Sequence, residues 1–532
     1  MPMAAHRFIK PAVGFCVLAF AGASAALPIV AERAVPLSSV IIIGGGPTAD
    51  HNQVAIESNV RYVSRLLPAQ AHKSTLFADG DTNSATVLYV DDVKTLPEPQ
   101  QTVALAIQGN DQNFTTYGHY RKPTLPGSLD GPSTRDNVGQ LIDRAAVTTP
   151  SDHGGLLLYF TGHGSPLNGN LDNNHYDLWG KAGNLSVKDL SGQIAHLPPN
   201  MPVYVVMAQC YSGAFGNLLF EGGDPTAGYS KRDIVGYFAS TKNRVAAGCT
   251  TALNEAEYHD FTSYFFAALT GSDRMGRRVT GADFNRDGKV GMDEAFAWTL
   301  VNDQSIDTPV CTSDVLLRHD VPFVEEEVIK TPYSDLKKWA TRPQRAALEG
   351  LSEKLALTSE DRYAQADKMM SPHGDPTSQQ LFRDANGKFR QLRTAQRQFL
   401  LARWPDLRNS GSQAYQTART EAAKYYETNT EAKAAAKELI AAYDAMQKAS
   451  EGTQQPENMA AYAIRFVRVA TSVVLAHRLQ QTGTPEQKAR FARQSANERR
   501  PLLEAATANT TRPTEPNNDI NNDEKERETA TE

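Results

Sequence analysis

Five short apolar runs, separated by long segments, set the strongest constraint on how residues 36–320 can fold. Several of these runs are apolar throughout, which is typical of parallel strands that are covered on both faces. Helical patterns lie between them, as in repeated strand-helix-strand units. The sequence therefore predicts an α/β region with a mostly parallel sheet. The runs are SVIIIGG (39–45), STLFADG (74–80), GLLLYFTG (155–162), PVYVVMAQ (202–209) and DIVGYFAS (233–240).

The other regions of the chain differ in character. Residues 81–150 are rich in Asn, Asp, Pro and Gly, and we expect a long irregular insertion there. From about 330 to 505 strand-like runs vanish and apolar residues recur every three or four positions, which predicts a separate all-helical domain. Residues 506–532 are polar and acidic, with almost nothing that could form a core, so we expect disorder. One helical stripe comprises Tyr462, Phe466, Val469, Val473 and His477, and another comprises Phe389, Leu392, Phe399 and Leu400.

The first 25 residues have the pattern of a cleaved secretory signal peptide. Arg7 and Lys10 precede an apolar run, and Ala23-Ser24-Ala25 offers the small residues that signal peptidase accepts. The run is shorter than the ~20 residues that a spanning helix needs, and we expect no membrane span in the mature chain. The predicted location is therefore secreted or periplasmic. A net charge of -6 gives no reason to expect a nucleic acid as partner.

A histidine and a cysteine follow two neighbouring predicted strands. His163 comes just after GLLLYFTG, and Cys210 comes directly after PVYVVMAQ. Because functional groups collect at the carboxyl ends of strands in a parallel sheet, we expect both side chains at one edge. An imidazole can take the proton of a thiol and so activate it as a nucleophile. The backbone N–H groups of Gly164 and Cys210 are our candidates for stabilising a developing oxyanion.

The cysteine count fits a free nucleophile. The chain has four cysteines, and Cys16 would leave with the signal peptide. Three remain, so at least one thiol stays unpaired within the chain in an oxidising compartment. A disulfide between Cys249 and Cys311 would leave Cys210 free, but the sequence does not decide this pairing.

These two motifs carry a family resemblance. LLLYFTGHGSP followed by VYVVMAQCYSGAF resembles the legumain (asparaginyl endopeptidase) family of cysteine peptidases, which are relatives of caspases and gingipains. The resemblance spans about residues 38–250. It implies a caspase-like three-layer α/β sandwich over 36–325, with a catalytic dyad of His163 and Cys210. It also implies a peptide or protein substrate, and a helical C-terminal domain that docks on the catalytic face.

The substrate pocket departs from the family pattern. Legumains have an Arg-His-Gln run whose arginine helps bind an Asn or Asp side chain; here the matching run is His51-Asn52-Gln53. The resemblance therefore suggests His51 and Gln53 as pocket residues, with His51 in place of the arginine. Ser240 and Thr241, after the fifth strand, are further pocket candidates. Ala208 and Gln209 stand where the family has an acidic residue and alanine before the nucleophile.

A second motif predicts a metal site. DFNRDGKVGMDE, residues 283–294, matches the twelve-residue calcium loop of an EF-hand position by position. Gly288 occupies the sharp turn at position 6. A poor entering helix precedes the loop, so we expect a single structural Ca²⁺ and not a paired sensor. The predicted ligands are Asp283, Asn285, Asp287, the Lys289 carbonyl and the bidentate carboxylate of Glu294.

Together these features predict a secreted, calcium-braced cysteine endopeptidase. Two alternatives remain open at this point. The same acyl-enzyme could be captured by an amine, which would make the protein a transpeptidase or transamidase. The chain could also be a catalytically inactive calcium-binding interaction protein. The helical domain, instead of docking on the catalytic face, could be a partner-binding or oligomerising appendage.

Overall fold

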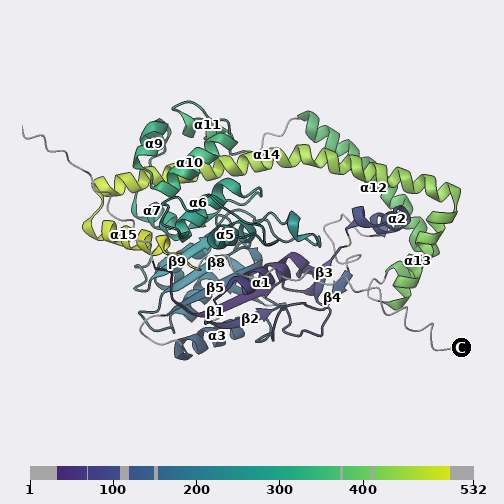
Figure 1. Ribbon diagram of the computed structural model, residues 1–532, viewed down its shortest axis with the longest axis horizontal. Helices are drawn as coiled ribbons and strands as arrows, with labels where there is room; N and C mark the ends of the chain where they lie inside the picture. The colour runs from purple at the N-terminus through teal and green to yellow at the C-terminus, as the bar shows by residue number, and fades with distance from the viewer. Residues whose placement is uncertain are drawn as a thin grey trace, which may run out of the picture.

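The computed structural model describes residues 33–503, except 69, 91, 108–118, 149–153, 182, 372–375 and 409–411. The predicted signal peptide and the predicted disordered tail lie outside the described residues. The chain is α/β, with a mostly parallel mixed sheet followed by a helical C-terminal region (Figure 1). That much of the prediction is confirmed.

The sheet has the strand order β10-β9-β8-β5-β1-β2. The pairs β2–β1, β1–β5, β5–β8 and β8–β9 are parallel, and the edge strand β10 is antiparallel to β9. All five apolar runs of the sequence supply strands to it. The bounds are β1 Leu37–Gly45, β2 His72–Phe77, β5 Gly155–Ser165, β8 Val203–Met207, β9 Ile234–Phe238 and β10 Val310–Cys311. Beyond the core, β6 (His175–Asp177) pairs with the end of β5 and with β7 (Asn184–Ser186).

Helices cover both faces of the sheet, which explains why its strands are apolar throughout. Ile41 and Ile43 of β1 pack on one face, against α3 (Arg135–Thr148) and α4 (Val187–Ile194). Val40 and Ile42 of the same strand pack on the other, against α1 (Val54–Leu66) and α5 (Phe261–Thr270). Successive side chains of a strand point to opposite faces, so an apolar residue is needed at each position.

The expected irregular insertion at 81–150 is wrong in part. It contains β3 (Val87–Tyr89), α2 (Glu98–Ile107), β4 (His119–Arg121) and α3, with β3 and β4 forming a small antiparallel sheet. Val138, Leu141, Ile142 and Ala145 of α3 are buried at helical spacing beneath the main sheet. The turn-forming residues of this segment end its elements but do not prevent them.

The helical region contains α8 to α15. Their bounds are α8 Glu325–Lys330, α9 Tyr333–Trp339, α10 Arg342–Lys354, α11 Arg362–Lys368, α12 Pro376–Arg403, α13 Gln413–Thr428, α14 Thr430–Thr482 and α15 Pro485–Arg499. In Figure 1, α14 runs along the top of the molecule, and α12, α13 and α2 gather towards one of its ends. Val103 and Leu105 of α2 share a buried cluster with Tyr415 and Tyr426 of α13.

The helical region and the α/β region share hydrophobic cores. Leu300 of α6 (Met292–Asn302) packs with Leu348 of α10 and Phe466 of α14. Leu502 and Leu503, after α15, enter the cluster on one face of the sheet. Residues from both sides of the predicted boundary near residue 330 therefore pack in the same hydrophobic cores. Removing residues 330–532 would take Leu502 and Leu503 out of the core on one face of the sheet.

Contrary to the expectation for the mature chain, one helix is long and apolar enough to cross a membrane. Among the described residues this is α14, and 78% of its most apolar window is buried inside the protein. A core helix passes the same test of length and composition, because it too must bury an apolar surface. The packing of Phe466 and Val473 against α10 and its neighbours accounts for the apolar character of α14.

Candidate functional site

The ends of β5 and β8 bring His163 and Cys210 to one edge of the sheet. β5 and β8 are parallel neighbours, with Phe160 in register with Met207. His163 lies three residues beyond the first of this pair, and Cys210 lies three beyond the second. A Cβ placed on Gly164 would lie 2.3 Å from the Cys210 carbonyl oxygen. The two backbones are therefore in contact, and glycine is the residue that this approach permits.

The imidazole of His163 is held through Nε2. That nitrogen lies 2.9 Å from the carbonyl oxygen of His51 and 2.9 Å from Oε1 of Gln53. Since a carbonyl oxygen can only accept, Nε2 carries the proton, and Nδ1 of the neutral ring is left as the acceptor. Burial lowers the pKa of His163, and the nearby His51 lowers it further. At neutral pH the ring is therefore a neutral base.

Gln53, predicted to line the substrate pocket, contacts His163 through its side-chain amide oxygen in the structure. It is the N-cap residue of α1 and is buried, and its backbone pairs with Leu88 of β3. His51 is exposed at the end of the short helix η1 (Ala49–His51), and its Nδ1 lies 2.9 Å from Thr48 Oγ1. Its ring stands edge-on to that of His163, with centroids 5.9 Å apart. Of these two residues, only His51 is open to solvent.

A strained turn presents the thiol of Cys210. β8 ends at Met207, and Tyr211 adopts a left-handed conformation with φ of 59° before the 3-10 helix η5 (Ser212–Leu219) begins. Non-glycine residues adopt this conformation at a cost, often where a side chain must be held in a special position. The N–H of Ala246 points at Cys210 Sγ from 3.2 Å, while the Ala246 carbonyl lies 3.6 Å from the sulfur.

Burial raises the pKa of the Cys210 thiol, and the contacts with Ala246 oppose that rise. With the cysteine pKa raised and the histidine pKa lowered, the resting pair is a neutral thiol and a neutral imidazole. A neutral thiol is a poor nucleophile, so any attack by this sulfur would need a base to take its proton.

A second thiol, Cys249, lies in the same site. Its Sγ is 3.8 Å from Nδ1 of His163 and 3.6 Å from the Gly162 carbonyl oxygen. Burial, and then repulsion from Cys210, raise the pKa of Cys249. The sequence offered one signal that we did not use: Cys249 lies 11 residues beyond β9, at the same edge of the sheet as the ends of β5 and β8.

The disulfide considered between Cys249 and Cys311 is not formed, because Cys210, Cys249 and Cys311 are all free thiols. Cys311 ends the edge strand β10, is buried, and contacts Ser313 Oγ at 3.3 Å. Cys249 contacts His163 at the carboxyl end of β5 instead. The spacing of the two cysteines in the sequence gave no information about these different surroundings.

The loop after β9 packs against the turn that holds Cys210. A Cβ on Gly213 would lie 2.6 Å from the Ser240 carbonyl oxygen, so the loop packs directly on η5. Ser240 is fully buried and its hydroxyl donates to the Arg244 carbonyl, so it serves the loop and is not open to a substrate. Thr241 is half-buried and donates to Asn243.

One buried arginine of the helical region is connected to the loop after β9 through Asp307. Arg465 of α14 is 1% exposed and donates to the carbonyls of four residues, Leu300, Asp303, Ser305 and Asp307. The carboxylate of Asp307 in turn accepts from the N–H of Ala247, at 2.6 Å, and from that of Phe261. Ala247 follows the residue that contacts Cys210. Hydrogen bonds to the carbonyl and carboxylate of Asp307, joined by covalent backbone, therefore link α14 to the loop beside Cys210.

The calcium motif folds into the loop that the pattern predicts. Gly288 has φ of 86°, the left-handed value that the turn at position 6 requires. The Asp283 carboxylate accepts from the N–H groups of Arg286, Asp287 and Gly288, and that of Glu294 accepts from Asn285 and Gly291. Lys289 donates its N–H to Asp287, which leaves its carbonyl oxygen for a ligand.

The residues of this loop fit Ca²⁺ by type and by charge. Burial raises the pKa of Glu294, and repulsion from Asp283 and Asp287 contributes to the rise. A carboxylate that accepts one N–H retains further lone pairs for a cation. Among the described residues, however, no group of three or more His, Cys, Asp or Glu side chains already converges as a metal cluster. Their oxygens would have to turn from backbone amides toward the ion.

Comparison with known proteins adds no assignment. No family model matches the sequence, and no curated protein matches it.

Proposed function

We propose that the protein is a secreted or periplasmic cysteine endopeptidase of the legumain type, with a caspase-like sandwich, a Cys210–His163 dyad and one structural Ca²⁺. One observation carries this proposal. His163 is anchored through Nε2, which leaves Nδ1 as the base, 3.8 Å from the Cys249 thiol and at the sheet edge that also carries Cys210. A thiol is only a weak hydrogen-bond donor, so this contact leaves Nδ1 able to take a proton.

The residues suggest a route for hydrolysis. The sulfur of Cys210 attacks the peptide carbonyl carbon while His163 Nδ1 takes the thiol proton. The carbonyl oxygen becomes an oxyanion, for which the N–H groups of Gly164 and Cys210 are the proposed donors. His163 returns the proton to the leaving amine, which gives a thioester. Water, deprotonated by His163, then attacks the thioester and releases the acid and the free thiol.

Two features favour Cys210 over Cys249 as the nucleophile. A backbone N–H points at the sulfur of Cys210 and stabilises the charge of a thiolate. Each sulfur also lies 3.6 Å from a carbonyl oxygen, that of Ala246 for Cys210 and that of Gly162 for Cys249, so the Ala246 N–H is the contact that distinguishes them. The pKa of Cys249 is also raised by burial and by Cys210 itself. Cys249 is therefore the matched control for every test of Cys210.

The substrate class is tested with a library of peptides varied at the residue before the cleaved bond. The full-length protein is incubated with the library in calcium and reductant, with the Cys210→Ala protein as the blank. We expect cleavage that is absent from the blank, and its preferred residue shows whether replacing the family's arginine by His51 changed the specificity. Products joined to an added amine would instead indicate transpeptidation, and no cleavage would favour an inactive binding protein.

The pH profile tests the role of His163. Because its pKa is lowered from 6.5, the ring stays a base down to a pH below 6.5, and kcat/KM should fall only below that pH. Gln53→Glu places a carboxylate beside Nε2 and favours the imidazolium, so the acid limb should move up by about 1–2 pH units. Gln53→Met is the uncharged control. An acid limb that does not move in Gln53→Glu would contradict this role.

Calcium binding is tested by thermal unfolding with calcium or with a chelator. A ligand at 100 times its Kd stabilises the folded state by about 2.7 kcal/mol. We expect calcium to raise Tm in the wild type and to have no effect in Glu294→Gln, which loses the bidentate carboxylate. Glu326→Gln, on exposed α8, is the control and should keep the full response. Equal responses in the two variants would exclude this loop as the site.

A further inference from the structure

A cavity of about 630 Å³ lies between the helical region and the sheet, away from the proposed dyad. Its walls come from α6, α7 (Thr312–Asp320), α10, α14 and α15. This volume is in the range of pockets that hold small molecules, ~300–1,000 Å³. The exposed residues Thr341, Arg342 and Arg499 are among those that line it, so the cavity reaches the solvent.

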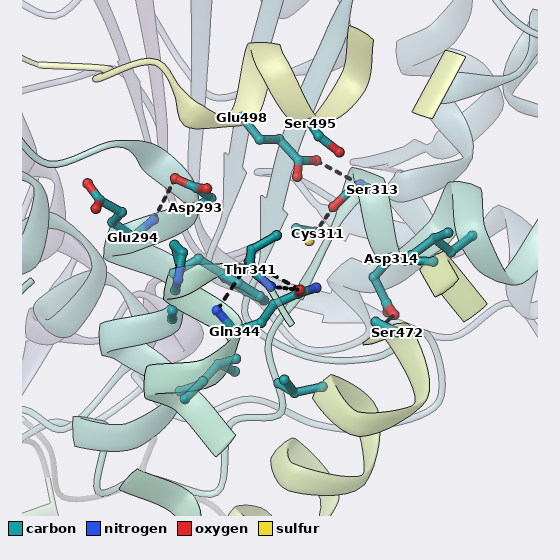
Figure 2. A pocket seen from close by; sticks show the side chains of 18 of the residues that line it. Asp293, Glu294, Cys311, Ser313, Asp314, Thr341, Gln344, Ser472, Ser495 and Glu498 are labelled. Carbon is teal, nitrogen blue, oxygen red and sulfur yellow. Dashed lines mark hydrogen bonds between the residues drawn. The ribbon is translucent and has the colours of Figure 1, made fainter. Parts of the chain in front are cut away.

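Two carboxyl groups from different elements face this cavity. Asp293 lies in the first turn of α6 and Glu498 in the last turn of α15. The N–H of Met292 donates to the Arg500 carbonyl at 3.2 Å, which holds the two ends together. Figure 2 shows both carboxyl groups on the same side of the cavity. Glu498 is only 3% exposed.

Among the described residues neither carboxyl group forms an ion pair, although burial raises the pKa of Asp293 to about 8 and the charge of Arg499 opposes that rise. Glu498 Oε1 accepts from the hydroxyl of Thr312, the N–H of Ser313 and the amide of Gln494. Asp293 Oδ1 accepts from the N–H of Glu294. Burial raises the pKa of Glu498, as expected for an acid held in an apolar site without a counter-charge.

The basic residues around the cavity are committed elsewhere. Arg468 pairs with Asp314, and Arg465 pairs with Asp303. Arg342 donates to the Asn285 carbonyl, and His477 stacks on Trp339 with ring centroids 3.8 Å apart. Arg499 also lines the cavity; it donates to the Ser495 carbonyl, and its charge lowers the pKa of Asp293. Within the described part of the chain, the carboxyl group left without a neighbouring cation is therefore Glu498.

The remaining lining is mostly apolar and aromatic. It includes Phe296, Leu300, Leu317, Trp339, Val469 and Phe491. Such a surface favours an apolar body, and the two acids favour an ammonium group at one end of it. A neutral apolar molecule would leave both acids unpaired, and an anion would be repelled by them.

We propose that this cavity is a binding site for an organic ammonium with an apolar body, whose charged group lies between Asp293 and Glu498. The free amino end of a short apolar peptide and a small aromatic amine share this chemistry. The site uses none of the residues of the proposed dyad, so it stands or falls independently of the peptidase activity.

Calorimetric titration of the full-length protein tests the site with Phe-Leu-amide and with 2-phenylethylamine. We expect the amines to bind, and their uncharged counterparts, N-acetyl-Phe-Leu-amide and 2-phenylethanol, to bind at least about tenfold more weakly, the equivalent of ~1.4 kcal/mol. Binding of the dipeptide alone assigns the site to peptide amino ends, and binding of both amines assigns it to apolar amines in general.

Asp293→Asn and Glu498→Gln keep the shape of the cavity and remove the charges. Each variant should weaken binding of the amines and leave binding of the uncharged counterparts unchanged. Thermal unfolding establishes that the variants are folded, and Glu326→Gln is again the surface control. Equal affinity for charged and uncharged probes, or full amine binding by the doubly substituted protein, would overturn the proposal, as would absence of binding by both amines.

Discussion

Replacing Cys210 with alanine is expected to abolish peptide hydrolysis, with a loss in kcat/KM on the order of 10⁴-fold or more. The reason is that the Cys210 sulfur is the proposed attacking atom, and the N–H of Ala246 favours its thiolate form. Initial rates on the best library peptide, at equal concentrations of folded protein, measure the loss.

Cys249→Ala is the matched comparison, because it removes a second thiol from the same site. We expect this variant to keep activity within about tenfold of the wild type, since it loses a neighbour of His163 and not the attacking atom. A large loss in Cys249→Ala with activity retained in Cys210→Ala would exchange the roles of the two cysteines. Equal activity in all three proteins would remove both from the mechanism.

Replacing Arg465 with alanine is expected to lower the free energy of unfolding by about 3–5 kcal/mol, because it leaves a buried carboxylate without its partner. Asp303 and Arg465 are both fully buried, with Nη2 3.6 Å from Oδ2. The four carbonyls that Arg465 binds would also lose a donor. Chemical denaturation of the full-length protein measures the change.

Arg478→Ala provides the control on the same helix. Arg478 forms a partly exposed ion pair with Glu327, and pairs of this kind contribute about 0–1 kcal/mol. Since Asp307 connects Arg465 to the loop beside Cys210, Arg465→Ala should also reduce kcat at temperatures where it remains folded. Similar stability losses in the two variants would contradict the account of Arg465 as a buried anchor.

Much of the sheet could be predicted from the sequence. Each apolar run supplied a strand, because a strand covered on both faces must be apolar at every position. The run at 155–162 forms β5, which pairs with β8. His163 and Cys210 follow these two strands, and the rule that functional groups collect at the carboxyl ends of parallel strands placed both residues at one edge. The fold of the loop at 283–294 was also predictable, since it depends on a local pattern.

The features that the sequence did not reveal depend on contacts between distant segments. Gln53 reaches His163 across 110 residues, and Cys249 reaches it across 86. Neither contact leaves a periodic pattern. The packing of Phe466 on α6 and α10 likewise joins two regions that composition had separated, because composition reports the type of an element and not its neighbours.

The most direct test of the account is covalent labelling with a peptidyl electrophile. The full-length wild type, Cys249→Ala and Cys210→Ala are each treated at neutral pH, and the modified residue is located by mass spectrometry of the digested protein. The account predicts one label, on Cys210, in the first two proteins and none in the third. Labelling of Cys249 in preference to Cys210, or equal labelling of the denatured and folded proteins, would contradict it.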